Sequence, residues 1–291
     1  MSAYSDLDTP GDGERAAPQV LDLHTHPLVP DTWTPAVRQY VERANPEIAA
    51  RASDLTDPAA MRDVLRAQGV DQAVVLAEEA PLTTGMVTSE YILDFTAEVE
   101  GLHAFVSLNP NLDADLVKRL KELRAHGEVK GLKFLPSYQH FTPNDARLYP
   151  LYAYVQELGL PITFHTGISR FPGTRLKYAD PLLLDDVAVD FPHLAILLAH
   201  AGRGVWYDSA ALLATLHENV YLEVSGLPAR NLPRYFPNLD RLADKIVFGS
   251  DFPGLSSIQE NIDAIRDIFS PEDAHRILWE NGARLLRLEY T

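Results

Sequence analysis

Two histidines separated by one residue follow a short apolar run in the segment Val20–Pro27, whose sequence is VLDLHTHP. In an extended strand alternate side chains point to the same face, so His24 and His26 share a face with Asp22. Neutral imidazole is the commonest metal ligand in proteins, and two imidazoles at this spacing can bind one ion without bending the backbone. The motif alone leaves open a second reading, in which it is only the polar end of a strand.

Three further candidate residues also end apolar runs: His165 in PITFHTG, His200 in AILLAHAGRG and Asp251 in KIVFGSDFPG. In a barrel of parallel strands, the carboxyl ends of the strands form the functional face, and polar side chains at those ends lie close together. Each histidine taken alone is more often a hydrogen-bonded core residue. Their joint occurrence at predicted strand ends favours a metal site.

Short apolar runs separated by amphipathic segments must position these side chains. We predict strands at Val20–Pro27, Gln72–Ala77, Ala104–Leu108, Gly131–Leu135, Pro161–His165, Ala195–Ala199, Tyr221–Val224 and Lys245–Gly249. The runs are continuously apolar, which is typical of strands buried on both faces. The pattern predicts an α/β protein with a (β/α)8 TIM barrel, and an open doubly wound sheet is the alternative. Helices over residues 256–269 and 271–288 are expected to cover the last strand.

The domain organisation follows from the same pattern. Residues 1–19 lack periodicity and are expected to be disordered or extended, and residues 20–291 are expected to form a single barrel domain. The long stretch from Pro27 to Thr56, with a helix expected at Pro35–Arg43, could cap a site. No apolar run reaches the roughly 18 residues of a membrane span, and the start lacks a signal pattern, so we expect a cytoplasmic protein.

The composition limits the partners. The 291 residues include 25 Lys and Arg against 41 Asp and Glu, which gives a formal net charge of −16. This charge repels nucleic-acid phosphates and anionic lipids, so neither nucleic acid nor a membrane is expected as a partner. A homodimer is compatible with the sequence, which does not determine the oligomeric state. The absence of cysteine excludes disulfides, thiolate ligands and a cysteine nucleophile.

The motifs DLHTH, FHTG, AHAGRG and GSDFP, together with the closing ILWENGARLL, resemble the metal-dependent amidohydrolase superfamily. The resemblance extends from about residue 20 to 288 and is nearest to the branch that includes aminocarboxymuconate semialdehyde decarboxylase. It implies that one divalent ion is held by His24, His26, His165 and Asp251. It also implies that His200 contacts metal-bound water and not the metal. The donor set suits zinc, with iron, manganese or cobalt as alternatives.

Lys133, in VKGLKFLP, lies on the fourth predicted strand. In binuclear members of the superfamily a lysine at this place is carboxylated and bridges two ions, whereas mononuclear relatives have a similar pattern without the bridge. We expect a substrate-facing or ion-pairing lysine, with Glu223 as a candidate partner. The other substrate-binding candidates are loop residues at the expected mouth of the barrel, for which plain solvation is the alternative: Tyr138, His140, Arg170 and Arg203.

The resemblance implies a metal-dependent hydrolase in which metal-activated water attacks a C–N or C–O bond of a small molecule. His200 would orient that water or carry a proton, and Asp251 would share the proton. The alternative is a lyase that decarboxylates or hydrates an unsaturated or aromatic carboxylic acid with the same ligands. An arginine at the mouth, Arg203 or Arg170, would favour the lyase. A third hypothesis is a binding protein with a structural metal.

Overall fold

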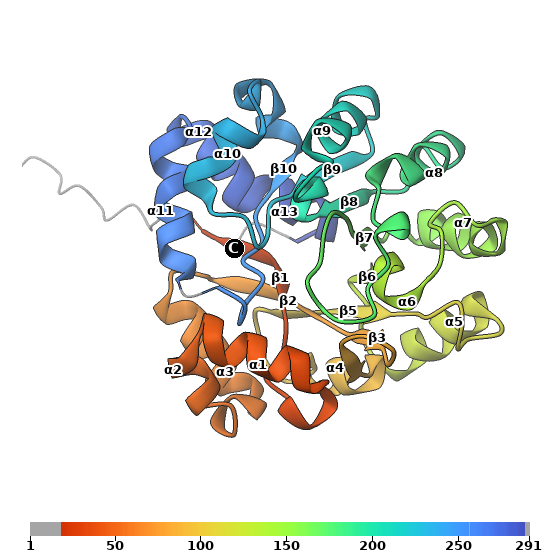
Figure 1. Cartoon of the computed structure of the whole chain (residues 1–291), viewed down its shortest axis with the longest axis horizontal. Helices are drawn as coiled ribbons and strands as arrows, with labels where there is room; N and C mark the ends of the chain where they lie inside the picture. Colours follow the sequence, from red (N-terminus) through yellow and green to blue (C-terminus); the bar gives the residue numbers. More distant parts are fainter. Residues whose placement is uncertain (1–18, 256, 289–291) are drawn as a thin grey trace, which may run out of the picture.

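Eight strands form one parallel sheet in the order β1-β2-β5-β6-β7-β8-β9-β10 in the computed structural model, which describes residues 19–255 and 257–288 (Figure 1). Hydrogen bonds from Leu23 N to Phe248 O and from Asp251 N to His24 O join the first and last strands, so the sheet closes. The predicted TIM barrel is confirmed. Its strands are β1 (Leu21–Thr25), β2 (Gln72–Leu76), β5 (Leu102–Ser107), β6 (Gly131–Phe134), β7 (Ile162–His165), β8 (Ile196–Ala199), β9 (Val220–Glu223) and β10 (Ile246–Val247).

The strands begin within two residues of their predicted starts, because their continuous apolar runs are buried on both faces. Helices surround the barrel (Figure 1). They include α3 (Pro58–Ala67), α4 (Ser89–Thr96), α5 (Leu116–His126), α7 (Tyr149–Leu158), α8 (Asp185–Asp190), α9 (Tyr207–Leu216), α10 (Leu232–Tyr235) and α11 (Ile258–Ile268). Local sequence sets their ends: the Asp57 side chain caps α3 by accepting from Ala59 N at 2.9 Å, and α7 stops at Gly159 with a left-handed φ of 63°.

The C-terminal helices cover the last strand, as predicted, and the first strand as well. Helix α12 (Pro271–His275) leads through a π-helical turn into α13 (Asn281–Leu286), which packs against β1 and β10. A Cβ at Gly282 would lie 3.0 Å from Leu21 Cδ2, so the glycine permits close approach of helix and strand. Among the described helices, none combines the length and apolar character needed to span a bilayer.

Three further segments lie over the carboxyl ends of the strands. Helices α1 (Pro35–Ala44) and α2 (Pro46–Ala50) follow β1, and α6 (Pro136–Gln139) follows β6. A hairpin of β3 (Glu78–Ala80) and β4 (Gly85–Val87), which the sequence analysis missed, follows β2, and Trp33 bridges to it at Gly85. The helix predicted at Pro35–Arg43 is confirmed. Residues 1–18 of the predicted N-terminal segment lie outside the described residues, so the domain division stays a prediction.

Candidate active site

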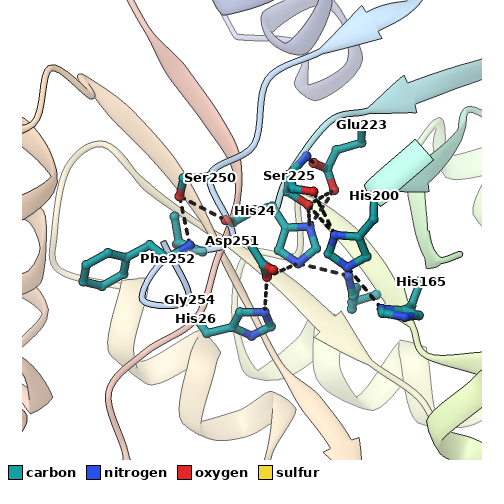
Figure 2. A network of polar contacts seen from close by, with 12 residues as sticks. His24, His26, His165, His200, Glu223, Ser225, Ser250, Asp251, Phe252 and Gly254 are labelled. Atoms are coloured by element: carbon teal, nitrogen blue, oxygen red, sulfur yellow. Dashed lines mark hydrogen bonds and ion pairs between the residues drawn. The ribbon is translucent and has the colours of Figure 1, made fainter. Parts of the chain in front are cut away.

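His24 and His26 lie beside Asp251 at the carboxyl end of the barrel. His24 Nε2 is 3.5 Å and His26 Nε2 is 3.6 Å from Asp251 Oδ1, and the two imidazole ring centroids are 5.2 Å apart (Figure 2). His24 lies on β1 and His26 directly follows it, so the alternation of side chains along the extended chain directs both rings to the same carboxylate. This carboxylate comes from the other end of the sequence, after β10.

His165 and His200 complete the cluster from β7 and from the turn after β8. His165 Nδ1 lies 3.1 Å from His200 Nε2, and the His24 and His200 ring centroids are 5.1 Å apart. One ligand atom each from His24, His200 and Asp251 lies within 4.8 Å of the others, a spacing that could hold a metal ion. The barrel therefore gathers the four histidines and Asp251 at one end, but the three-residue group contains His200, which was expected to contact water, and not the expected ligands His26 and His165.

The backbone at two of these residues adopts an uncommon conformation. His200 has a φ of 62° and Asp251 a φ of 67°, in the left-handed region that residues other than glycine rarely adopt. Such strain gathers at functional sites, where the surrounding structure holds it. Gly226 lies against the same side chains, and a Cβ there would be 2.8 Å from Asp251 Oδ2 and 2.7 Å from Arg203 Nη1. A side chain at position 226 would therefore have to displace Arg203 or Asp251, and its φ of 64° also favours glycine.

Glu223 and Ser225 fix the orientation of two imidazoles. Glu223 Oε2 lies 2.5 Å from His24 Nδ1, and the Ser225 backbone oxygen lies 3.0 Å from His200 Nδ1 (Figure 2). A neutral ring that donates its Nδ1 proton to such an oxygen presents the lone pair of Nε2, which is the arrangement found in metal-ligating histidines. The side chains are therefore oriented to offer Nε2 to an ion.

Two residues of the site, Ser225 and Glu78, were not predicted from the sequence. Glu78, on β3, has its Oε2 3.4 Å from His26 Nδ1 and lines the pocket. Both residues come directly after predicted strands, in QAVVLAEE and in YLEVSG. The strand-end criterion that identified the histidines would have identified them as well.

The charge state of the cluster suits a divalent cation. Burial, reinforced by nearby cations such as Lys133 or Arg203, holds the pKa values of the three buried histidines His24, His165 and His200 well below the usual 6.5. Burial by itself raises the pKa of Asp251, but the contact with His26 and the nearby positive charges lower it to about 2. Neutral imidazoles and an ionised carboxylate are the forms that ligate metals, so the donor set fits one divalent ion.

Lys133 lies deep in the site. Its side chain is 1% exposed, and its Nζ lies 3.3 Å from His24 Nε2. Burial lowers the pKa of Lys133 to about 8, although the negative charge of Glu223 acts to raise it. Burial raises the pKa of Glu223 to about 7, although the positive charge of Lys133 acts to lower it. The lysine therefore belongs to the polar floor of the pocket.

A cavity of about 480 Å³ opens above the cluster. Of the five residues predicted to bind substrate, Arg170, Arg203, Tyr138 and Lys133 line this cavity and His140 does not. His140 instead contacts the Gly173 backbone oxygen at 2.8 Å. The remaining walls are mainly apolar or aromatic and include Trp33, Val37, Tyr40, Val41, Val87, Leu135, Ile168, Phe171, Tyr207, Leu227, Pro228 and Tyr235.

Two aromatic contacts shape this cavity. The Tyr138 ring centroid lies 4.5 Å from that of His165, while the Tyr138 hydroxyl group lies 2.7 Å from Ser169 Oγ. At the mouth, the Tyr40 ring of α1 meets the Phe171 ring of the loop after β7 with centroids 5.5 Å apart. Segments from both sides of the barrel thus cover the cluster.

Comparison with solved structures shows the same fold in several bacterial proteins. An uncharacterised TIM-barrel protein from Bordetella bronchiseptica is 20% identical with a TM-score of 0.74, and the match covers 93% of this chain and 99% of that one. A dihydroxybenzoic acid decarboxylase from Polaromonas, with bound manganese and the inhibitor 2-nitroresorcinol, is 18% identical with a TM-score of 0.66 (94% and 98% covered). A 2-pyrone-4,6-dicarboxylic acid hydrolase from Acinetobacter baumannii, with citric acid bound, is described as probable and is 15% identical with a TM-score of 0.63 (92% and 99% covered).

Comparison of sequences assigns the family. A search of curated proteins found no match. A family model described as Amidohydrolase matches residues 21–288, which is nearly the whole predicted barrel domain. The match covers all the motifs on which the resemblance was based, from DLHTH to ILWENGARLL. The chain therefore belongs to the amidohydrolase superfamily and is an enzyme of that superfamily.

Proposed function

We propose that this enzyme catalyses the non-oxidative decarboxylation of an unsaturated or aromatic carboxylic acid at one divalent ion. The ion would be held by His24, His26, His165 and Asp251. The similarity to decarboxylases of dihydroxybenzoic acid and 5-carboxyvanillate supports this reaction over hydrolysis, which the resemblance to the superfamily puts first. We propose zinc as the ion, and the manganese in the Polaromonas structure makes manganese the first alternative.

The observation that carries the proposal is the placement of Arg203. Its Nε and Nη2 donate to the Ile168 backbone oxygen at 3.3 and 3.2 Å, which fixes the guanidinium plane. Its Nη1 makes no hydrogen bond within the described part of the chain and lies beside Gly226, close to Asp251. A fixed guanidinium is well shaped to bind a carboxylate, and this one would hold the substrate's carboxylate at the proposed metal centre.

The reaction needs a carboxylate site, a place for the electron pair and a proton donor. The bond between the carboxylate carbon and its neighbour breaks, carbon dioxide leaves, and the neighbouring carbon keeps the electron pair and takes up a proton. A bound ion would supply charge stabilisation as a Lewis acid. The proton comes from solvent, and we assign its relay to the carbon to Asp251 and His200 Nε2, which lie within the cluster and can each first accept it. The aromatic walls, Tyr138 and Phe171 among them, would pack against the substrate and exclude water.

Hydrolysis of a C–N or C–O bond of a small molecule is the second candidate. The similarity to a probable 2-pyrone-4,6-dicarboxylic acid hydrolase favours it, as does the burial of His200, which could take a proton from water. In that reaction Arg203 would only bind or orient the substrate.

A substrate screen with the purified enzyme separates the two candidates. Unsaturated and aromatic acids, lactones and amides are incubated with metal-loaded protein while carbon dioxide and hydrolysis products are both measured. Arg203→Met should lower kcat/KM for the acids by about a hundredfold or more, because a charge-assisted contact to the leaving carboxylate is lost. Arg147→Met is the matched control, since Arg147 pairs with Asp145 at the surface. Hydrolysis products without carbon dioxide would contradict the proposal and support the second candidate.

A further inference from the structure

Lys133, His24 and Glu223 form a buried chain of contacts through one imidazole ring. Lys133 Nζ lies 3.3 Å from His24 Nε2, and Glu223 Oε2 lies 2.5 Å from His24 Nδ1 on the other side of the ring. The His24 and Lys133 side chains are each 1% exposed, and Glu223 is fully buried. The hydrogen-bonding groups in this order are complementary. The lysine ammonium donates to Nε2 of the neutral imidazole, and Nδ1 of the same ring donates to the carboxylate.

The same nitrogen is needed for the metal. His24 Nε2 has a single lone pair, and Glu223 fixes the ring so that this lone pair faces the centre. A nitrogen that accepts a hydrogen bond from an ammonium cannot coordinate an ion at the same time. A divalent ion placed between His24 and Asp251 would also lie close to the Lys133 charge, with little water to screen the repulsion.

We propose that the Lys133 ammonium is a built-in competitor of the metal: it occupies His24 Nε2 in the ion-free protein and leaves this nitrogen when the ion binds. The inference rests on the metal centre of the proposed function and is independent of the reaction catalysed there. It makes the binding of the ion an exchange of one cation for another. The affinity for metal is therefore lower than the donor set alone would provide.

A carboxylated Lys133 that bridges two ions would behave in the opposite way. That lysine would be a ligand, so its removal would weaken metal binding, and bicarbonate would strengthen it by supplying the carboxyl group. Competition predicts that removal of the lysine strengthens metal binding and that bicarbonate has no effect. The sign of the change in affinity therefore distinguishes the two roles.

The experiment measures metal affinity of the ion-free full-length chain by competition with a chromophoric chelator, separately for Zn²⁺ and Mn²⁺ at constant pH. Lys133→Met is compared with Lys130→Met, which removes the same charge from a lysine paired with Glu128 at the opposite end of β6. We expect Lys133→Met to bind each ion about tenfold more tightly or better, because the like charge is gone. Lys130→Met should stay within about twofold of the wild type, because surface charges are screened.

Weaker binding by Lys133→Met than by the wild type would overturn the proposal, and so would an unchanged affinity. A second measurement needs no variant and stands even if Lys133→Met does not fold. The wild-type affinity and the number of ions bound are compared in bicarbonate-free and bicarbonate-containing buffer. We expect no difference, and tighter binding or a second ion in bicarbonate would overturn the proposal. Neither readout involves carbon dioxide release, so failure here is distinguishable from failure of the proposed decarboxylase.

Discussion

Glu223→Gln tests whether a buried carboxylate sets the affinity of the metal centre. Glu223 is 0% exposed and accepts from Ser225 N at 2.6 Å, from Ser225 Oγ at 3.0 Å and from His24 Nδ1 at 2.5 Å. Glutamine keeps the volume of the side chain but carries one acceptor oxygen, an NH₂ group and no charge. A single oxygen cannot accept from both Ser225 N and His24 Nδ1, so the partner that fixes the tautomer of His24 is weakened, and such outer partners are worth about 10–100-fold in metal affinity.

The substitution has a second effect, on the ion-free protein. It removes the negative charge that faces the buried Lys133 across the His24 ring, and the loss of one partner in a directly paired buried ion pair, about 3–5 kcal/mol, is the upper limit of the cost. We therefore expect a lower free energy of unfolding in urea together with metal binding that is weaker by about 10–100-fold. Glu218→Gln is the matched control, because it makes the same chemical change at an exposed side chain just ahead of β9.

Chelator competition measures the affinity, and circular dichroism in urea measures the stability. An affinity of Glu223→Gln equal to that of the wild type would refute the role of the carboxylate in orienting His24. A loss of stability without a loss of affinity would show that Glu223 serves only as the counter-ion of Lys133.

Three other outcomes are expected. The double change His24→Ala/His26→Ala should abolish metal binding in elemental analysis while circular dichroism stays that of a folded barrel, and full retention of the ion would refute the ligand assignment. His200→Asn should lower turnover by about 10²–10⁴-fold and keep the ion, since we assign His200 to proton transfer; a metal loss like that of the double variant would make it a ligand. Burial lowers the pKa of His103, which contacts Gln72 Oε1 at 2.7 Å, from 6.5 to about 4. The unfolded chain therefore binds this proton more readily, and the contribution to stability, present above pH 6.5, is lost as the pH falls towards 4. His103→Gln should reduce the difference between urea midpoints at pH 4.5 and pH 7, and an unchanged difference would contradict this assignment.

The strands and their order could be predicted because the pattern is local. A buried parallel strand requires a short run of apolar residues whatever its neighbours are, and closure of the barrel follows from the repetition of such runs with intervening helices. The face shared by His24 and His26 is equally local, since it follows from the two-residue period of a strand. The hairpin of Glu78–Ala80 and Gly85–Val87 escaped prediction because strands of three residues have no period to detect.

The contacts within the site were decided by the tertiary structure. The sequence placed both Lys133 and His140 at or after the fourth strand, but only the folded chain turns Lys133 onto His24 Nε2 and leaves His140 outside the pocket lining. Similarly, nothing local relates Glu223 to a ring that lies 199 positions away along the chain. Spacing determines which face a side chain takes, whereas the distance between residues of different strands depends on the stagger and closure of the whole barrel, which no single segment encodes.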